Sequence, residues 1–269
     1  MPIAAFITQN YGKAFDMQEV LYERLTPSQF QERLKKAPIA YLPLGTLEWH
    51  SWHLPLGSDS LQSQTFFIKL AQRAGGVVLP SLFLGPDGVK KVDGFEYYGM
   101  DVFGYSPKAP QQLIGSAYWI PSDLFLMLFE AVLKQISRAG FKIVVAHGHG
   151  PSVNLVIENI GKLGKKFGLT IMTLWRGKGQ RDADLEFQYD HAARNETSIM
   201  MALHPDLVHM ENLSKDRKKK PLAIIGKDPR TYASAEHGEK IVQLHLERME
   251  RILKDQLLRL QESKSGSHA

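Results

Sequence analysis

Short apolar runs alternate with helix-like segments along most of the chain, and this alternation limits the folds open to it. Apolar runs typical of buried strands occupy 37–44, 77–80, 141–146 and 169–175. Helical periodicity is found in 61–75, 123–140, 154–166, from 196 onward and in 234–261. Strands separated by helices pair in parallel through crossovers, which cover the faces of the sheet. The order therefore predicts an α/β fold with a mostly parallel central sheet flanked by helices on both faces.

The 269 residues contain no internal repeat or low-complexity linker, so we expect a single domain over 1–262. The small, polar residues 263–269 are typical of a disordered tail. The first residues lack a basic segment followed by a long apolar one, and no apolar stretch approaches the ~20 residues of a membrane span. We therefore expect a cytoplasmic protein without a membrane partner.

The chain has no cysteine, which excludes disulfide scaffolds, thiolate zinc sites, iron–sulfur clusters and cysteine nucleophiles. Any metal ion must therefore be bound by nitrogen and oxygen ligands. The net charge of +5 comes from basic residues spread along the chain, and the densest basic run, 215–220, is typical of a solvated loop. We therefore predict no nucleic-acid partner.

The polar segment 45–59 directly follows the first apolar strand. Glu48 and His50 point to the same side if this segment is extended, because side chains alternate along a strand. A carboxylate and an imidazole that converge in this way can chelate a divalent cation, and Asp59, after a Pro- and Gly-containing turn, can bridge two ions. The alternative is a polar loop with a few hydrogen-bonded histidines. The density of histidines, carboxylates and tryptophans favours a site.

A second polar turn, 147–152, follows the strand 141–146 and contains His149 between two glycines. Glycines allow the backbone to turn sharply and to approach a ligand. A phosphate-binding loop is the alternative interpretation, but the Lys-Ser/Thr and GxGxxG patterns of such loops are missing here.

The third polar segment, 190–198, opens a helix. Asn195 can cap this helix, and Glu196 would lie in its first turn, where the helix dipole favours a carboxylate. From the residues alone, Glu196 fits a helix-start carboxylate better than a metal ligand.

These segments resemble the three signature blocks of the creatininase (creatinine amidohydrolase) family. The matching stretches are PLGTLEWHSWHLPLGSD, VVAHGHGPS and DHAARNETSIMMALHPDLV, in the family's order between residues 43 and 208. The resemblance implies a creatininase-like α/β fold and a homo-oligomer, often a hexamer. It also implies a binuclear metal-dependent hydrolase that cleaves a non-peptide C–N bond of a small cyclic or linear amide through a metal-activated hydroxide.

The resemblance further implies the roles of individual residues. One divalent ion would be held by Glu48, Asp59 and His149. The second would be held by His50, Asp59 and Glu196, so that Asp59 bridges the pair. His191 matches the family's proton-transfer histidine. Ligands made only of nitrogen and oxygen permit Zn, Mn or Fe.

This chain departs from the family pattern around the expected substrate cavity. Family members that hydrolyse creatinine have a glutamate two residues after the metal-binding histidine, where this chain has Pro151, and Glu196 takes the ligand role instead. The sequence therefore defines the metal ligands better than the substrate. A lactone, formamide or peptide-maturation substrate is an alternative, and so is a non-catalytic protein that binds a metal or small molecule on the same scaffold.

Three further residues are candidates for orienting ligands or contacting substrate. His53 either orients a metal ligand or is a packed, hydrogen-bonded histidine of the turn. Ser116 follows a glycine in a pair that resembles the family's Gly-Thr, and Trp175 either forms a pocket wall or closes the core. The aromatic-rich segment 87–119 lacks regular periodicity, so we expect a lid, a subunit contact or a surface excursion.

Overall fold

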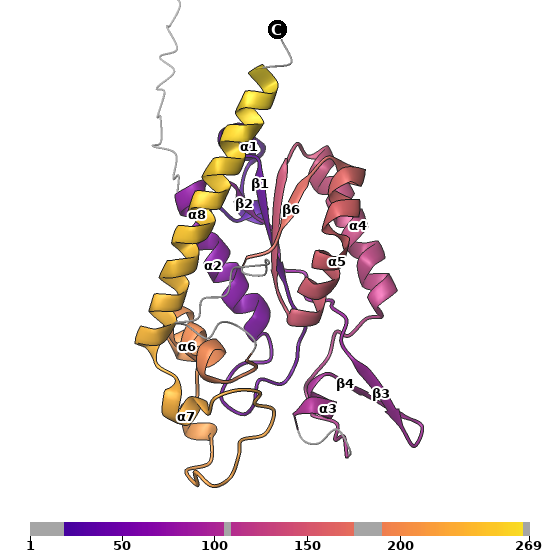
Figure 1. The fold of residues 1–269 in the computed structure, drawn as a ribbon, viewed down its shortest axis with the longest axis vertical. Coiled ribbons are helices and arrows are strands. Elements are labelled where there is room, and N and C mark those ends of the chain that lie inside the picture. Colours follow the sequence, from indigo (N-terminus) through magenta and orange to yellow (C-terminus); the bar gives the residue numbers. More distant parts are fainter. Residues whose placement is uncertain (1–18, 105–108, 175–189, 266–269) are drawn as a thin grey trace, which may run out of the picture.

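The central sheet of the protein has four parallel strands. The computed structural model describes residues 19–104, 109–174 and 190–265. The strands are β1 (Ile39–Leu44), β2 (Val77–Val78), β5 (Ile143–Gly148) and β6 (Thr170–Met172), in the order β2-β1-β5-β6. The predicted parallel sheet is confirmed, as Figure 1 shows at the centre of the molecule.

Alternate residues of the buried strands serve two separate layers of core. Ile39 and Tyr41 pack with helices α2 (Ser58–Ala74) and α8 (Ala235–Ser265). Ala40 and Leu42 pack on the other side, with α4 (Ser122–Arg138) and α5 (Gly150–Phe167). Because both faces are covered, the strands are apolar at nearly every position. The expected helices on both faces of the sheet are therefore confirmed (Figure 1).

Strands β1 and β5 are neighbours and end together, since Leu44 pairs with Gly148. The backbones are so close that a Cβ on Gly148 would lie 1.7 Å from the Leu44 carbonyl oxygen, and Gly148 has φ of +145°. Only glycine fits such a position. The polar segments after β1 and β5 therefore start side by side, at the carboxyl edge of the sheet where α/β proteins place their sites.

Several elements differ from those expected. β5 runs two residues past Ala146 because pairing with β1 continues, and α8 reaches Ser265, four residues past the expected helix end at Gln261. The prediction that 87–119 has no regular structure is wrong, since it contains an antiparallel hairpin and a short helix, namely β3 (Val89–Val92), β4 (Phe95–Tyr98) and α3 (Met100–Phe103). The remaining elements are η1 (Tyr22–Arg24), α1 (Pro27–Lys36), α6 (Arg194–Leu203), η2 (Pro205–Leu207), η3 (Met210–Asn212) and α7 (Pro229–Tyr232). No helix within the three described ranges has both the length and the apolar character needed to cross a bilayer.

The close packing of α6 against α8 depends on Gly238, which predicts a large effect on stability. A Cβ at Gly238 would lie 1.8 Å from the Ser198 carbonyl oxygen, so Gly238→Ala must push the helices apart. We expect a loss of about 1–3 kcal/mol in the free energy of unfolding, measured by urea denaturation. The control is Gly161→Ala in α5, where no atom lies within 4 Å of the added methyl and helix propensity favours alanine. Equal stability of the two variants would contradict this packing.

Candidate metal centre

Two histidines at the carboxyl edge of the sheet are oriented by hydrogen bonds to backbone oxygens. Nδ1 of His50 donates to the Glu48 carbonyl oxygen at 3.1 Å, and Nε2 of His191 donates to the Trp49 carbonyl oxygen at 2.6 Å. A carbonyl oxygen only accepts, so each neutral ring carries its proton on that nitrogen. The other nitrogen, Nε2 of His50 or Nδ1 of His191, is then free to bind a cation or accept a proton.

Three of the five predicted ligands lie at helix starts. Asp59 is in the first turn of α2, Glu196 is in the first turn of α6, and His149 is the residue before α5. Carboxylates in first turns are favoured by the helix dipole. The segments between the strands and these helices therefore bring side chains from three distant parts of the chain to one place.

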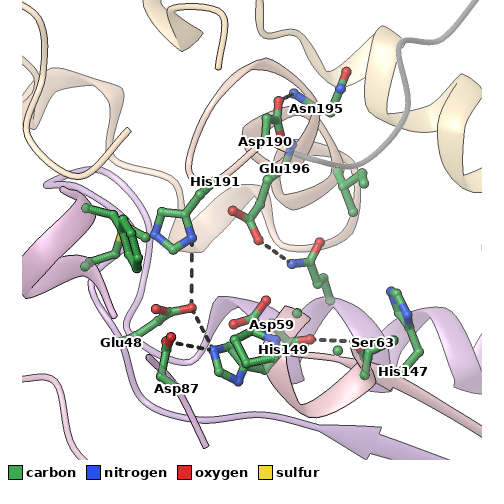
Figure 2. Close-up of a pocket in the computed structure, with 18 residues that line it drawn as sticks. Glu48, Asp59, Ser63, Asp87, His147, His149, Asp190, His191, Asn195 and Glu196 are labelled. Carbon is green, nitrogen blue, oxygen red and sulfur yellow. Dashed lines mark hydrogen bonds and ion pairs between the residues drawn. The ribbon is translucent and has the colours of Figure 1, made fainter. Parts of the chain in front are cut away.

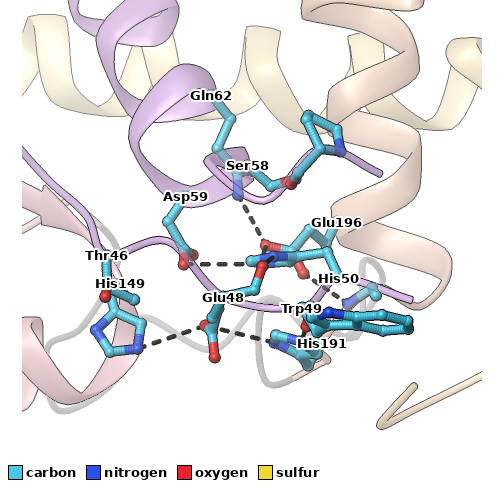
Figure 3. A network of polar contacts seen from close by, with 12 residues as sticks. Thr46, Glu48, Trp49, His50, Ser58, Asp59, Gln62, His149, His191 and Glu196 are labelled. Carbon is cyan, nitrogen blue, oxygen red and sulfur yellow. Dashed lines mark hydrogen bonds and ion pairs between the residues drawn. The ribbon is translucent and has the colours of Figure 1, made fainter. Parts of the chain in front are cut away.

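Five side chains form two groups that share one carboxylate. In the first group, ligand atoms of Glu48, Asp59 and His149 lie within 4.8 Å of one another. In the second, those of His50, Asp59 and Glu196 do the same. Figure 3 shows Glu48 between His149 and His191, and Asp59 directed at His50. A third group of Glu48, His50 and His191 meets the same limit. The five residues predicted as ligands therefore converge.

The separations between these atoms suit cation binding better than direct hydrogen bonding. His50 Nε2 lies 3.6 Å from Asp59 Oδ2 and 3.5 Å from Glu196 Oε1, and His149 Nε2 lies 3.4 Å from Glu48 Oε1. Typical hydrogen bonds are about 2.7–3.2 Å. Ligands about 2.1 Å from a tetrahedral ion lie about 3.4 Å apart. His50 Nε2, Asp59 Oδ2 and His149 Nε2 are buried without hydrogen-bond partners in the described structure. The residues present thus fit divalent cations.

The electrostatics of the centre favour added positive charge. Burial raises the pKa of the Glu48 carboxyl to about 8 and also raises the pKa of Asp59. Burial alone would lower the pKa of His50, but the charges of Glu196, Asp59 and Glu48 raise it to about 10. Burial likewise acts to lower the pKa of His149, but Glu48, Asp87 and Asp59 together raise it to about 8. Without a metal ion these buried carboxylates are compensated by protons, on themselves and on the neighbouring histidines, and a bound cation can take the place of those protons.

The carboxylate of Glu196 is held in a fixed orientation. Its Oε1 accepts a hydrogen bond from Gln62 Nε2 at 2.8 Å, and its Oε2 accepts from the Ala192 backbone N–H at 2.6 Å. Burial acts to raise the pKa of Glu196, but His50, His191 and the hydrogen bond from the Ala192 N–H hold it well below its usual range. Glu196 is therefore an anion directed at His50 rather than a solvated helix-start carboxylate.

The expected cap of α6 is wrong. Asp190, not Asn195, satisfies the start of this helix by accepting from the backbone N–H groups of Asn195 at 2.6 Å and Glu196 at 3.1 Å. Asn195 instead uses its side-chain oxygen to contact His237 Nε2 at 2.8 Å. Asp190 precedes the helix by four residues, so its carboxylate can accept from two N–H groups of the first turn. Asn195 lies inside that turn and cannot do so.

A cavity of about 330 Å³ opens onto the metal centre. Its polar lining includes Glu48, Asp59, Asp87, His149, His191 and Glu196, as Figure 2 shows. Met100, Phe103 and Pro151 supply apolar parts of the wall. Part of the segment 87–119 therefore reaches the cavity. Its volume lies at the small end of the range for ligand pockets, which favours a small molecule.

Of the three further candidates for orienting ligands or contacting substrate, two lie in the described structure beside the centre. His53 Nε2 is 2.8 Å from Thr197 Oγ1 and so ties the loop to α6 beside Glu196. Ser116 Oγ accepts from the Trp49 N–H at 3.2 Å and so fixes the loop that carries Glu48. Neither is among the described residues that line the cavity. Trp175 lies outside the described residues.

A family model described as creatininase, creatinine amidohydrolase, matches residues 23–253. Creatinine amidohydrolase of Pseudomonas putida is 22% identical over 214 residues, which cover 73% of this chain and 76% of that protein. A 3-dehydro-scyllo-inosose hydrolase of Thermotoga maritima is 22% identical over 202 residues, which cover 71% of this chain and 58% of that protein. The chain therefore spans little more than half of this second relative.

Solved creatininases share the fold. A variant described as Zn–Zn type has a TM-score of 0.66 at 20% identity, covering 88% of this chain and 98% of that chain. A manganese creatininase gives a TM-score of 0.64, and a variant complexed with creatine gives 0.66, at the same identity and coverage. At such low identity the likeness establishes the architecture and leaves the chemistry to the side chains.

Proposed function

The chain belongs to the creatininase family of metal-dependent amidohydrolases, and from this premise we propose that it hydrolyses a non-peptide C–N bond of a small cyclic or linear amide at a two-cation centre. The observation that carries this proposal is the pair of buried ligand groups that share Asp59. A single shared carboxylate between two such groups is the arrangement that a binuclear hydrolase needs.

In this proposal Glu48, Asp59 and His149 hold one cation, and His50, Asp59 and Glu196 hold the other. Zn and Mn, found in the descriptions of creatininase neighbours, are suited to these nitrogen and oxygen donors, as is Fe. When bound, two divalent cations supply a water of lowered pKa and polarise the substrate carbonyl. The chain's own residues provide the rest of the chemistry.

His191 is the proposed proton carrier. Its Nε2 donates a hydrogen bond to the Trp49 carbonyl oxygen, so the neutral ring has its lone pair on Nδ1. Nδ1 lies 3.9 Å from Glu48 Oε1. The ring stacks on His50 with centroids 4.3 Å apart. Burial and the charge of His50 lower the pKa of His191 to about 4, which keeps it neutral near pH 7. Nδ1 can therefore accept a proton from the attacking water and pass it to the leaving nitrogen.

The cavity wall near His149 indicates which amide the protein can hydrolyse. Pro151, which lines the cavity, has no group that could bind a metal ion or accept a hydrogen bond through its side chain. The resemblance to the family implies a glutamate at this position in members that hydrolyse creatinine. We therefore propose an amide other than creatinine as the substrate.

A second candidate function has a specific observation in its favour. The Thermotoga maritima relative, a 3-dehydro-scyllo-inosose hydrolase, is as similar in sequence as the creatinine amidohydrolase. A different hydrolysis, such as that of a lactone, a formamide or a maturing peptide, is therefore the second candidate function of this centre. Retention of all five proposed ligands argues against the non-catalytic alternative.

A substrate screen tests the proposed function. Protein reconstituted with Mn or Zn is assayed against cyclic amides, formamides, guanidino compounds and lactones, with chelator-treated protein as the control. We expect hydrolysis of at least one amide that disappears with chelation and returns with metal. Hydrolysis at an unchanged rate in metal-free protein would contradict the proposal. Hydrolysis of formamides or lactones alone would favour the second candidate function.

The expected assembly as a homo-oligomer, up to a hexamer, and the expected cytoplasmic location stay predictions. Sedimentation equilibrium of the metal-loaded protein measures the first. A single species with the mass of one chain would contradict it.

A further inference from the structure

A carboxylate that the family motifs do not include lies against the metal centre. Oδ2 of Asp87 is 3.4 Å from Nε2 of His149, the same separation as Glu48 Oε1 has from that nitrogen. The His149 ring is 1% exposed, and Nε2 has no hydrogen-bond partner in the described structure. Figure 2 shows Asp87 and Glu48 directed at His149 from the same side of the cavity. The unpartnered nitrogen therefore faces two carboxylates.

The base of the β3–β4 hairpin orients Asp87. Its Oδ1 accepts from the Gly88 N–H at 2.5 Å, and the Gly99 N–H closes the hairpin by donating to the Gly88 carbonyl oxygen at 3.0 Å. A Cβ on Gly99 would lie 2.4 Å from Asp87 Oδ2. The backbone at Gly99 therefore packs directly against the carboxylate. Oδ1 of Asp87 is hydrogen-bonded to the Gly88 N–H, and Oδ2 faces His149.

We propose that Asp87 is a fourth carboxylate of the centre and binds the cation that Glu48, Asp59 and His149 hold, an inference that rests on the proposed function. The 3.4 Å separation exceeds a typical hydrogen bond and equals the spacing of about 3.4 Å between ligands of a tetrahedral ion. The hairpin inserted in 87–119 thus supplies a metal ligand in addition to part of the cavity wall.

Charge balance is an independent argument for this role. Glu48, Asp59 and Glu196 bring three negative charges against the four positive charges of two divalent cations. Asp87 adds the fourth, and its side chain is only 10% exposed. Buried charges are stable when they are compensated locally. With Asp87 the centre is neutral before any hydroxide or substrate is bound.

Asp87→Asn tests the proposal by metal affinity rather than by activity. Ion stoichiometry and dissociation constants are measured by competition with a chromophoric chelator. We expect one ion to bind about tenfold or more weakly, while the ion at His50 and Glu196 is retained. Asp93→Asn is the matched control, because it removes the same charge from the exposed turn of the same hairpin. Folding of each variant is checked by circular dichroism.

Gly99→Ala provides a test that leaves every charge in place. The added methyl must displace Oδ2 of Asp87, so we expect a weakened ion as in Asp87→Asn. Gly94→Ala is the control, because Gly94 also has positive φ, +83° against +49° at Gly99, but has no atom within 4 Å of the added methyl. If Asp87→Asn does not fold, the metal affinities of Gly99→Ala and Gly94→Ala test whether Asp87 is a ligand.

The outcomes separate this inference from the proposed function. If wild-type protein binds two ions and Asp87→Asn binds both as tightly as Asp93→Asn does, Asp87 is not a ligand and the proposed function stands. If reconstituted wild-type protein binds no ions, the proposed function fails and the inference fails with it. Weakening of one ion in Asp87→Asn and in Gly99→Ala, but in neither control, supports the inference.

Discussion

Asp59→Ala is expected to abolish binding of both cations and to lower kcat/KM by about three orders of magnitude or more. Asp59 is the one residue shared by the two ligand groups, so its loss removes a ligand from each cation. His149→Ala is expected to differ. It removes a ligand from one group only, so activity is lost while the ion at His50 and Glu196 remains.

Thermal unfolding provides a second measurement on Asp59→Ala. Asp59 Oδ2 is buried without a hydrogen-bond partner, and burial raises the pKa of this carboxyl. Added Mn or Zn should raise the Tm of wild-type protein by mass action and leave that of the variant unchanged.

Asp123→Ala is the control for Asp59→Ala. Asp123 is an exposed aspartate in the first turn of α4, so its removal tests the loss of a first-turn carboxylate outside the site. We expect both ions and full activity in that variant. Two tightly bound ions in Asp59→Ala would show that the two groups do not share a bridging ligand.

His191→Ala is expected to keep both ions and to lose turnover by about 10²–10⁴-fold. His191 contacts the centre through Nδ1, and the five proposed ligands remain in place without it. The measurement pairs metal analysis with kcat. Added imidazole should restore part of the activity, because the removed ring leaves room beside Glu48, whereas loss through misfolding would not be rescued.

His209→Ala is the matched control for His191→Ala. His209 is a surface histidine whose Nδ1 lies 3.1 Å from Glu211 Oε1, so its removal should leave kcat unchanged. Full turnover in His191→Ala would refute the proton-transfer assignment. Loss of an ion in that variant would instead make His191 a ligand, as the group of Glu48, His50 and His191 permits.

The central sheet could be predicted because its strands are continuous apolar runs with glycines at their ends. The burial of Ile39 through Leu44 on both sides is recorded in the sequence as an unbroken apolar segment. The β3–β4 hairpin could not be predicted in this way. Its strands have four residues each, with Lys90, Lys91 and Glu96 among them, and are mostly exposed or half-buried. Such short polar strands lack a periodic apolar signal.

The predicted ligands were those that lie in contiguous motifs at the ends of β1 and β5 and at the start of α6. Their motifs could be matched to a family, and parallel pairing of β1 with β5 explains why two of these motifs lie side by side. Asp87 and Gln62 escaped prediction because each is a single polar residue without a neighbouring motif. Only the tertiary contacts with His149 and Glu196 show that they belong to the site.

Anomalous X-ray diffraction from crystals of the Mn- or Zn-reconstituted protein is the most direct measurement of the centre. The account predicts two anomalous peaks, one within coordination distance of Glu48, Asp59 and His149 and one within coordination distance of His50, Asp59 and Glu196. Absence of both peaks after reconstitution, or peaks confined to surface carboxylates, would contradict it.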